Sequence, residues 1–264
     1  MFYAGAIVGT LIFGWISDHY GRYWSFILSN YVIMITGILT PFANGFVSFI
    51  IIRFAMGLGF LTFFMAMYML SLEYVSKEKR ALVGNLSLAI AMSFGGCIQP
   101  WILRAVGDWK IFHHILFCQM PALIFIAPCF VKESSRWLIT KGRVDEAMEI
   151  IKHIAIENGK DVNPAIYDSF RVKSMADYEK DKKSNFTWLD LFRSPILRKN
   201  MILMILIWSL TMMIFDGHLR NIENLNFSIY WTFTISSLIE LPADLLSIWG
   251  LDWIGRRWSA VISL

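Results

Sequence analysis

Asp18-His19-Tyr20-Gly21-Arg22 lies between two long apolar runs near the start of the chain. The same pattern, Asp-x-x-Gly-Arg, follows another apolar run near the other end, as Asp252-Trp253-Ile254-Gly255-Arg256-Arg257. Each copy predicts a tight turn between two membrane helices. In such a turn the carboxylate caps or pairs locally, the glycine permits a positive φ, and the arginine stays on the basic, cytosolic side. The repetition indicates an internally duplicated membrane protein and favours a transporter.

The composition supports the same class. Hydrophobic residues make up 56% of the 264 residues, charged residues only 17%, and the mean hydropathy is +0.54. A water-soluble domain of this length could not bury so much apolar surface. A membrane span takes about 17 to 25 apolar residues. Seven runs of this kind occur, followed by a short eighth: 1–17, 24–42, 47–72, 84–103, 111–130, 200–216, 227–249 and 258–264.

The basic residues predict the orientation, because cytoplasmic loops close to membrane spans are enriched in lysine and arginine. If the chain starts outside, the outer loops hold only Arg104, Lys110 and Arg220. The inner loops then hold Arg22, Lys77, Lys79, Arg80, Arg256 and Arg257. An outside start is therefore predicted. The net charge of +4 is explained by topology, and nothing else in the sequence favours a nucleic-acid partner.

Hydropathy divides the chain into three parts. Residues 1–130 are predicted to form five spans of an N-terminal transmembrane half, and residues 200–264 begin a C-terminal half with two spans and the short run. Between them, 131–199 is a hydrophilic cytosolic segment. Its apolar spacing predicts a helix over 144–155, and Ser194-Pro195 predicts the start of the sixth span. Residues 157–185 show no such pattern and are expected to be mobile.

Arg53 lies well inside the third predicted span, where an arginine costs about 2.5 to 3.5 kcal/mol to insert. Gly57 and Gly59 follow it by four and six positions, and glycines let a neighbouring helix approach closely enough to accept hydrogen bonds from a guanidinium. Two interpretations remain open. Arg53 either holds helices together or takes part in substrate contact or proton coupling.

Glu240 lies about halfway along the seventh span, in Glu240-Leu241-Pro242-Ala243-Asp244. Pro242 is expected to kink or loosen that helix. An acidic group at this depth requires a wet cavity or a cationic partner, and a fixed negative charge in a cavity selects cations. Glu240 is therefore predicted either to contact a substrate or to form a structural ion pair. Asp244 is expected to be structural.

Aromatic residues gather on the same spans. Phe64 and Tyr68 are four apart on the third span, and Trp208 and Phe215 are two turns apart on the sixth. Aromatic faces with one carboxylate suit an amphipathic organic cation, although ordinary packing between helices explains each residue equally well. His113-His114 has no third ligand at metal spacing, so neither a metal nor a cofactor is expected.

Charged residues recur at the predicted cytosolic helix ends and are expected to act as an inner gate. Ion pairs between the two halves would close it, and they would break when it opens. Each pair is weak alone, but a network present in one conformation can bias a two-state equilibrium. The charged residues of this set are Asp18, Arg22, Glu73, Arg80, Glu133, Arg136, Asp252, Arg256 and its neighbour Arg257. The turn glycines Gly21 and Gly255 complete the set.

The motifs in this chain, taken in their order along the sequence, resemble those of the major facilitator superfamily. Within that superfamily they resemble the organic cation, carnitine and organic anion transporters. The resemblance covers essentially the whole chain. Besides the two turns it rests on Gly14, on Arg53-x-x-x-Gly57-x-Gly59, on Glu73-Tyr74-Val75 with Arg80, on ESSRWL at 133–138 followed by Lys141-Gly142-Arg143 and Glu146-Ala147, and on Glu240-Leu241-Pro242-Ala243.

The resemblance implies a fold of twelve spans in two six-span halves, with alternating access around a midplane site. Phe64, Phe215 and Glu240 match positions that line the cavity of organic cation carriers, and the anion carriers have a lysine where this chain has Asp244. Ser135 replaces the usual proline of the ESSRWL-like motif. The chain is expected to begin at the family's second span and to stop at its ninth, as a fragment would.

The expected function is therefore transport of small organic cations across a lipid bilayer, by uniport or secondary-active transport. The plasma membrane is the location that the resemblance implies. Two alternatives remain: a truncated, non-transporting protein that regulates a complete carrier, and a sugar or other solute porter of the same superfamily. An enzyme is not expected, because no Ser/His, Asp/Asp or His-metal constellation appears at helical spacing.

Overall fold

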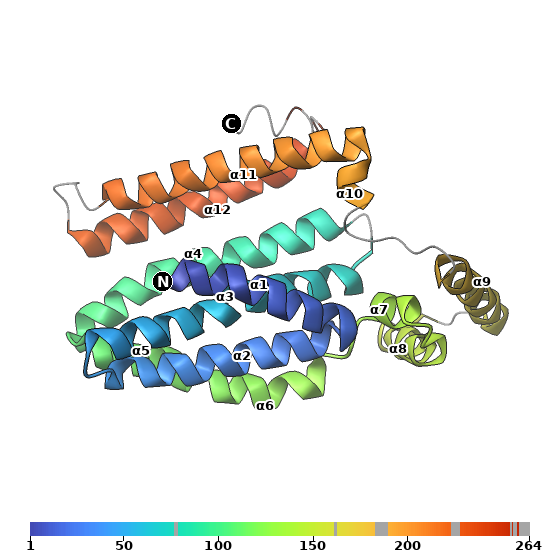
Figure 1. Ribbon diagram of the computed structural model, residues 1–264, viewed down its shortest axis with the longest axis horizontal. Helices are drawn as coiled ribbons and strands as arrows, with labels where there is room; N and C mark the ends of the chain where they lie inside the picture. The colour runs from blue at the N-terminus through green and yellow to red at the C-terminus, as the bar shows by residue number, and fades with distance from the viewer. Residues whose placement is uncertain are drawn as a thin grey trace. The chain divides into compact units, whose positions relative to one another are not determined.

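The computed structural model describes residues 1–76, 79–160, 163–182, 190–222 and 228–253, together with Gly255 and Trp258. The regular elements described in it are helices (Figure 1). In chain order they are α1 (Phe2–His19), α2 (Arg22–Leu39), the 3-10 turn η1 (Thr40–Phe42), α3 (Phe46–Tyr74), α4 (Arg80–Val106), α5 (Trp109–Cys118), α6 (Met120–Phe130), α7 (Ser135–Thr140), α8 (Val144–Glu157), α9 (Pro164–Lys182), α10 (Asp190–Arg193), α11 (Pro195–Ile222) and α12 (Ile229–Trp253).

Each of the seven predicted full-length spans is helical. The fifth is interrupted at Gln119, where α5 ends and α6 begins. Among the described residues, five segments are long and apolar enough to cross a membrane: Arg22–Phe42, Phe46–Tyr74, Leu82–Val106, Trp109–Ile126 and Pro195–Gly217. The other two predicted spans, 1–17 and 227–249, correspond to α1 and α12. The helix α1 extends beyond the first predicted span to the polar residues Asp18 and His19, and α12 contains the carboxylates of Glu240 and Asp244. The short run 258–264 lies outside the described residues apart from Trp258.

The hydrophilic segment 131–199 contains more helix than its sequence predicts. The expected helix over 144–155 is present as α8. A further helix, α9, occupies part of the segment expected to be mobile. It begins at Pro164, and the side chain of Asn163 caps it by accepting from the Ala165 N–H at 3.0 Å. The predicted start of the sixth span is confirmed, because α11 begins at Pro195.

The chain forms two compact units. Unit 1 comprises Met1–Gly84 and Val106–Lys182, and unit 2 comprises Asn85–Ala105 and Lys183–Leu264. The boundary passes through α4, so that most of this helix packs with the later part of the chain. The units therefore follow packing, whereas the predicted three parts follow hydropathy along the chain.

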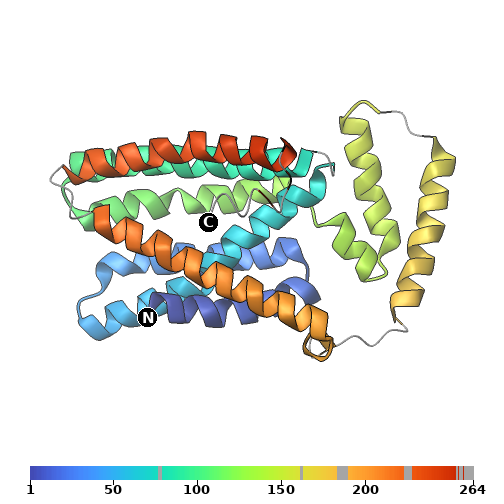
Figure 2. The ribbon, with the colours of Figure 1, turned by 90° about the horizontal axis from the view of Figure 1, so that it is seen from above.

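Within unit 1, α1, α2 and α3 form a bundle against which α5 packs. Its buried core contains Ile33 of α2, Met56 of α3 and Phe117 of α5. The helices α7, α8 and α9 gather beyond one end of this bundle (Figure 2). A second small core, formed by Trp137, Leu138 and Ala147, joins α7 to α8. The bundle and the α7–α8 pair therefore have separate buried cores.

The helices α1 and α3 approach each other closely because glycines, which have no Cβ, lie where they cross. Cβ atoms on Gly5 and Gly9 of α1 would collide with the carbonyl oxygens of Phe54 and Leu58 on α3. In the opposite direction, a Cβ on Gly57 would collide with the carbonyl of Phe2. Apolar lipid supplies no hydrophobic force between helices, so dense backbone packing of this kind holds membrane helices together.

Candidate functional site

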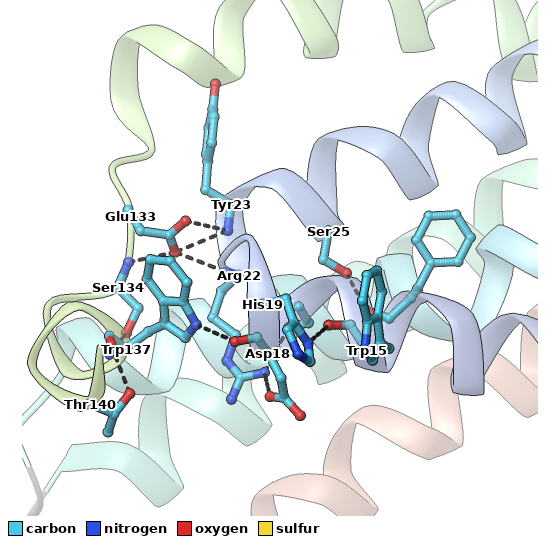
Figure 3. Close-up of polar contacts among 12 residues, drawn as sticks. Trp15, Asp18, His19, Arg22, Tyr23, Ser25, Glu133, Ser134, Trp137 and Thr140 are labelled. Atoms are coloured by element: carbon cyan, nitrogen blue, oxygen red, sulfur yellow. Dashed lines mark hydrogen bonds and ion pairs between the residues drawn. The ribbon is translucent and has the colours of Figure 1, made fainter. Parts of the chain in front are cut away.

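The first Asp-x-x-Gly-Arg turn joins α1 to α2 as the sequence predicts (Figure 3). Gly21 is buried with φ of +116°, a conformation that residues with a side chain rarely adopt. A Cβ at this position would also collide with the carboxylate of Glu133. In the second copy of the motif, Gly255 has φ of +82°. The predicted positive φ is confirmed in both turns.

Glu133 lies directly at the N-terminus of α2. Its Oε1 accepts hydrogen bonds from the backbone N–H groups of Arg22 at 2.9 Å, Tyr23 at 3.1 Å and Ser134 at 2.9 Å (Figure 3). The first N–H groups of a helix have no partner inside the helix, and the helix dipole favours a negative charge there. The carboxylate therefore ties the segment after α6 to the start of α2.

The side chains of the turn pair locally. The Arg22 guanidinium donates from Nη1 to Ser17 Oγ at 2.7 Å and forms an ion pair with Asp18 at 2.9 Å. The Trp137 indole N–H of α7 donates to the Asp18 carbonyl at 3.1 Å (Figure 3). A cavity of about 280 Å³ between α1, α2 and α3 is lined by this pair and by Thr62. The first turn, the ESSRWL segment and the bundle thus form one polar network.

The remaining predicted gate residues have different surroundings. Arg80 donates from Nε to the Val75 carbonyl at 3.3 Å, and Arg136 is exposed. Glu73 has a buried Oε2 without a hydrogen-bond partner among the described residues. Arg256, Arg257 and the side chain of Asp252 lie outside the described residues. The described contacts of the first turn lie within unit 1, and an inner gate between the two halves stays a prediction.

Arg53 is half-buried in α3, and its guanidinium carbon lies 5.1 Å from the centre of the Phe49 ring. It lines a pocket of about 430 Å³ together with Asn44, the α3 N-terminus and Trp109. Gly57 and Gly59 do admit neighbouring helices, since a Cβ on Gly57 would meet α1 and one on Gly59 would meet the Ser29 carbonyl of α2. The glycines therefore pack helices, whereas the described contact of Arg53 is a cation-π interaction.

The five predicted substrate residues are divided between the units. Phe64 and Tyr68 are half-buried one turn apart on α3, and Tyr68 approaches Gly84 at the start of α4. In unit 2, Trp208 and Phe215 are exposed on α11, and Glu240 is exposed on α12. Pro242 lies inside α12 and has no N–H, so the Leu238 carbonyl lacks its usual helical donor. A shared cavity for these residues stays a prediction.

The helices α8 and α9 carry charge pairs of their own. The Arg143 guanidinium bonds to the carboxylate of Glu146 in the first turn of α8, and this hydrogen bond lowers the pKa of Glu146 below its usual value. Arg171 of α9 pairs with Asp145 of α8 at 2.7 Å. Both acidic residues lie where a helix dipole favours negative charge. Among the described residues, no group of three His, Cys, Asp or Glu side chains could hold a metal ion.

Two tryptophans with structural roles were not predicted from the sequence. Trp137 joins α7 to the first turn, and Trp101 joins α4 to α12 by donating from Nε1 to Thr234 Oγ1 at 3.0 Å. Each contact connects residues that are more than a hundred positions apart. The signal for Trp101 was a tryptophan near the end of the fourth predicted span, which is common in membrane proteins. The signal for Trp137 was its place in the ESSRWL motif, and neither signal identifies a partner.

Comparison with known proteins gives consistent results. A family model described as "Sugar (and other) transporter" matches residues 1–257. Organic cation transporter 1 of Caenorhabditis elegans is 32% identical and organic cation/carnitine transporter 2 of Homo sapiens is 29% identical, each match covering 100% of this chain. The same matches cover 45% and 47% of the two relatives. The chain thus spans about half the length of the curated relatives it matches.

Solved structures agree on the fold. The proton:xylose symporter XylE, bound to 6-bromo-6-deoxy-D-glucose, superposes with a TM-score of 0.77 at 17% identity, over 97% of this chain and 59% of that one. A partially occluded inward open conformation of XylE from E. coli gives a TM-score of 0.63. Together with the apolar helices, these matches make the chain a multi-pass integral membrane protein. It belongs to the sugar (and other) transporter family of the major facilitator superfamily, and its relatives there include the organic cation transporters.

Proposed function

We propose that this chain is part of a carrier that moves small organic cations across the plasma membrane by alternating access. The observation that carries the proposal is the likeness to organic cation transporter 1 of Caenorhabditis elegans along the whole chain. In this proposal, 1–130 belongs to the N-terminal transmembrane half, 131–199 is cytosolic, and 200–264 begins the C-terminal half. The charged turn residues bias the gate between inward-open and outward-open states.

The proposed chemistry is noncovalent. Glu240 supplies a counter-charge for the cation, and Phe64, Tyr68, Trp208 and Phe215 supply aromatic faces. Arg53 either holds neighbouring helices together or takes part in substrate contact or proton coupling. For a uniporter, the membrane potential supplies about 2.3 kcal/mol per charge per 100 mV. That value corresponds to roughly fifty-fold accumulation of a monovalent cation inside the cell.

The first test is Glu240→Gln in the complete gene product, with uptake of a fluorescent organic cation as the readout. Loss of the counter-charge is expected to lower uptake at least tenfold, while surface expression stays equal. Asp244→Asn, one turn away on the same helix, is the matched control and should retain most of the uptake. Equal uptake by the Glu240→Gln variant and the wild type would remove Glu240 from the proposed site.

A zwitterion carrier is the second candidate. The beta-alanine transporter of Drosophila melanogaster is 30% identical, and beta-alanine carries both an amine and a carboxylate. An uptake panel of labelled cations, carnitine-like zwitterions, anions and sugars, with and without an imposed potential, distinguishes these classes. Potential-driven uptake of simple cations supports the proposal. Transport of sugar alone would favour a sugar porter of the same superfamily. No transport, but altered activity of a co-expressed carrier, would favour a truncated protein that regulates a complete carrier.

A further inference from the structure

The helices α4 and α12 of unit 2 are joined by a fixed tryptophan. The indole N–H of Trp101 donates to Thr234 Oγ1 at 3.0 Å, and that hydroxyl donates in turn to the Tyr230 carbonyl at 2.8 Å. Below them, Gly96 lies against the side chain of Ser237, which brings the two helices close together. The hydrogen-bond chain fixes the plane of the Trp101 ring relative to the first turn of α12.

Three rings gather at this junction, and we call them the outer aromatic cage: Trp101, Tyr230 and Trp231. The ring centres of Trp101 and Tyr230 are 6.4 Å apart with an angle of 34° between the planes. Trp231 meets Trp101 edge to face at 5.0 Å. Trp101 and Tyr230 are half-buried and Trp231 is exposed, so the cage has a packed base and an open side. In the predicted topology it lies at the outer ends of α4 and α12.

A cation already occupies this cage. The guanidinium carbon of Arg104 lies 5.5 Å from the centre of the Trp101 ring and 5.4 Å from that of the Tyr230 ring. Both distances are within the range of a cation-π interaction, and Trp is the strongest aromatic partner. Arg104 itself is exposed. Thus α4 contributes both one wall of the cage and the cation that lies against two of its rings, and the two residues are three positions apart.

We propose that the outer aromatic cage is a binding site for a small organic cation, a quaternary ammonium or a guanidinium, and that Arg104 is its tethered internal ligand. This inference rests on the proposed function, because it assigns the substrate class to a second, outer site. A free cation displaces Arg104, whose long side chain then swings into water. Arriving substrate is held on the outer face before it reaches the path between the halves.

The tether sets the affinity. A group attached through a short flexible linker has an effective concentration in the millimolar range, so it competes strongly with free ligand. The wild-type chain should therefore bind a free cation weakly, and removal of the arginine should expose the empty rings. This arrangement predicts an increase in binding after a mutation, whereas a residue that merely holds α4 against α12 predicts none.

The test measures binding of radiolabelled tetramethylammonium to the 264-residue chain in lipid nanodiscs, with guanidinium as a competitor. Arg104→Gln is expected to tighten binding about tenfold, because the tethered competitor is gone. Arg104→Lys keeps a tethered cation and should bind like the wild type. If Arg104→Gln binds no more tightly than the wild type and Arg104→Lys, the arginine is not an internal ligand and the proposal is overturned.

A second pair of variants tests the rings in the Arg104→Gln background. Tyr230→Phe keeps the aromatic face and should retain the gain in binding. Tyr230→Leu removes one wall, and the gain should fall severalfold. Trp249→Leu, an exposed tryptophan elsewhere on α12, is the control for general loss of aromatic surface. If all variants fold equally well and Tyr230→Phe and Tyr230→Leu bind tetramethylammonium equally, the cage proposal is overturned.

The two proposals fail in different ways. If the complete gene product transports no organic cation but the cage variants behave as expected, the carrier proposal fails and the cage remains a cation site. If uptake depends on Glu240 but Arg104→Gln leaves tetramethylammonium binding unchanged, the cage fails and the carrier proposal stands. Binding in nanodiscs requires no transport cycle, so the two readouts are independent.

Discussion

At the scale of single residues, the first turn depends on a pairing of glycine and glutamate that neither residue explains alone. Gly21 adopts a positive φ, and the absence of its Cβ leaves room for the Glu133 carboxylate. That carboxylate satisfies backbone N–H groups at the start of α2. A helix start that lacks acceptors costs about 1 to 3 kcal/mol for each buried group left unsatisfied. Gly21 and Glu133 therefore act as one unit.

Gly21→Ala is expected to lower the free energy of unfolding by roughly 2 to 4 kcal/mol. A Cβ at positive φ costs about 1 to 2 kcal/mol, and the displaced carboxylate loses hydrogen bonds worth about 1 kcal/mol each. Thermal unfolding in detergent, followed by tryptophan fluorescence, measures the change. Gly14→Ala is the matched control, because a Cβ on Gly14 meets nothing within 4 Å. Equal melting temperatures for the two variants would contradict the pairing.

At the scale of elements, the contact between α1 and α3 shows how a membrane bundle packs without a hydrophobic force. Gly5, Gly9 and Gly57 face carbonyl groups of the opposite helix, so backbone meets backbone along the crossing. On the other side of α3, Gly59 faces α2. Arg53 lies one turn before Gly57 and stacks on Phe49. The position of its charge therefore depends on the helix packing that these glycines allow.

Gly57→Ala is expected to force α1 away from α3, because its Cβ would collide with the backbone of Phe2. Overpacking of this kind costs about 1 to 3 kcal/mol. The comparison is with Gly95→Ala on α4, where the nearest side-chain atom to a Cβ is 4.0 Å away. The melting temperatures of the two variants, measured in the same detergent, test this expectation. The packing role fails if Gly57→Ala is as stable as Gly95→Ala.

At the scale of the whole molecule, the two glycine-arginine motifs predict the topology. Gly21 and Gly255 both have a positive φ. Arginine next to each glycine predicts that both turns face the cytosol. The orientation of α4 and α12 then follows, and with it the outer position of the aromatic cage.

Cysteine labelling in cells tests this topology. In a background without Cys97, Cys118 and Cys129, single cysteines replace Tyr20, Asn44 and Trp258, which are exposed. An impermeant maleimide should label Asn44→Cys from outside and should reach Tyr20→Cys and Trp258→Cys only after permeabilisation. Labelling of positions 20 and 258 from opposite sides of the membrane would contradict the predicted orientation and remove the cage from the outer face.

The sequence by itself determined five of the spans, the class of fold, the positive φ of Gly21 and Gly255, and the start of α11 at Pro195. Each of these depends on local information: apolar length, helical spacing, or a glycine or proline at a fixed position. The helix α9 was not anticipated, because its apolar residues do not form one continuous stripe and its start is set by the Asn163 cap and the proline.

Only the tertiary structure decided which residues meet. It placed Glu133 on the N-terminus of α2, grouped most of α4 with α11 and α12, and brought Arg104 with Trp101 against Tyr230. Hydropathy predicts that a segment lies in lipid. It carries no information about which helices pack against that segment, because apolar helices have similar hydropathy. Neighbours are chosen by small side chains, hydrogen bonds and ring contacts, and these connect residues that are far apart in the sequence.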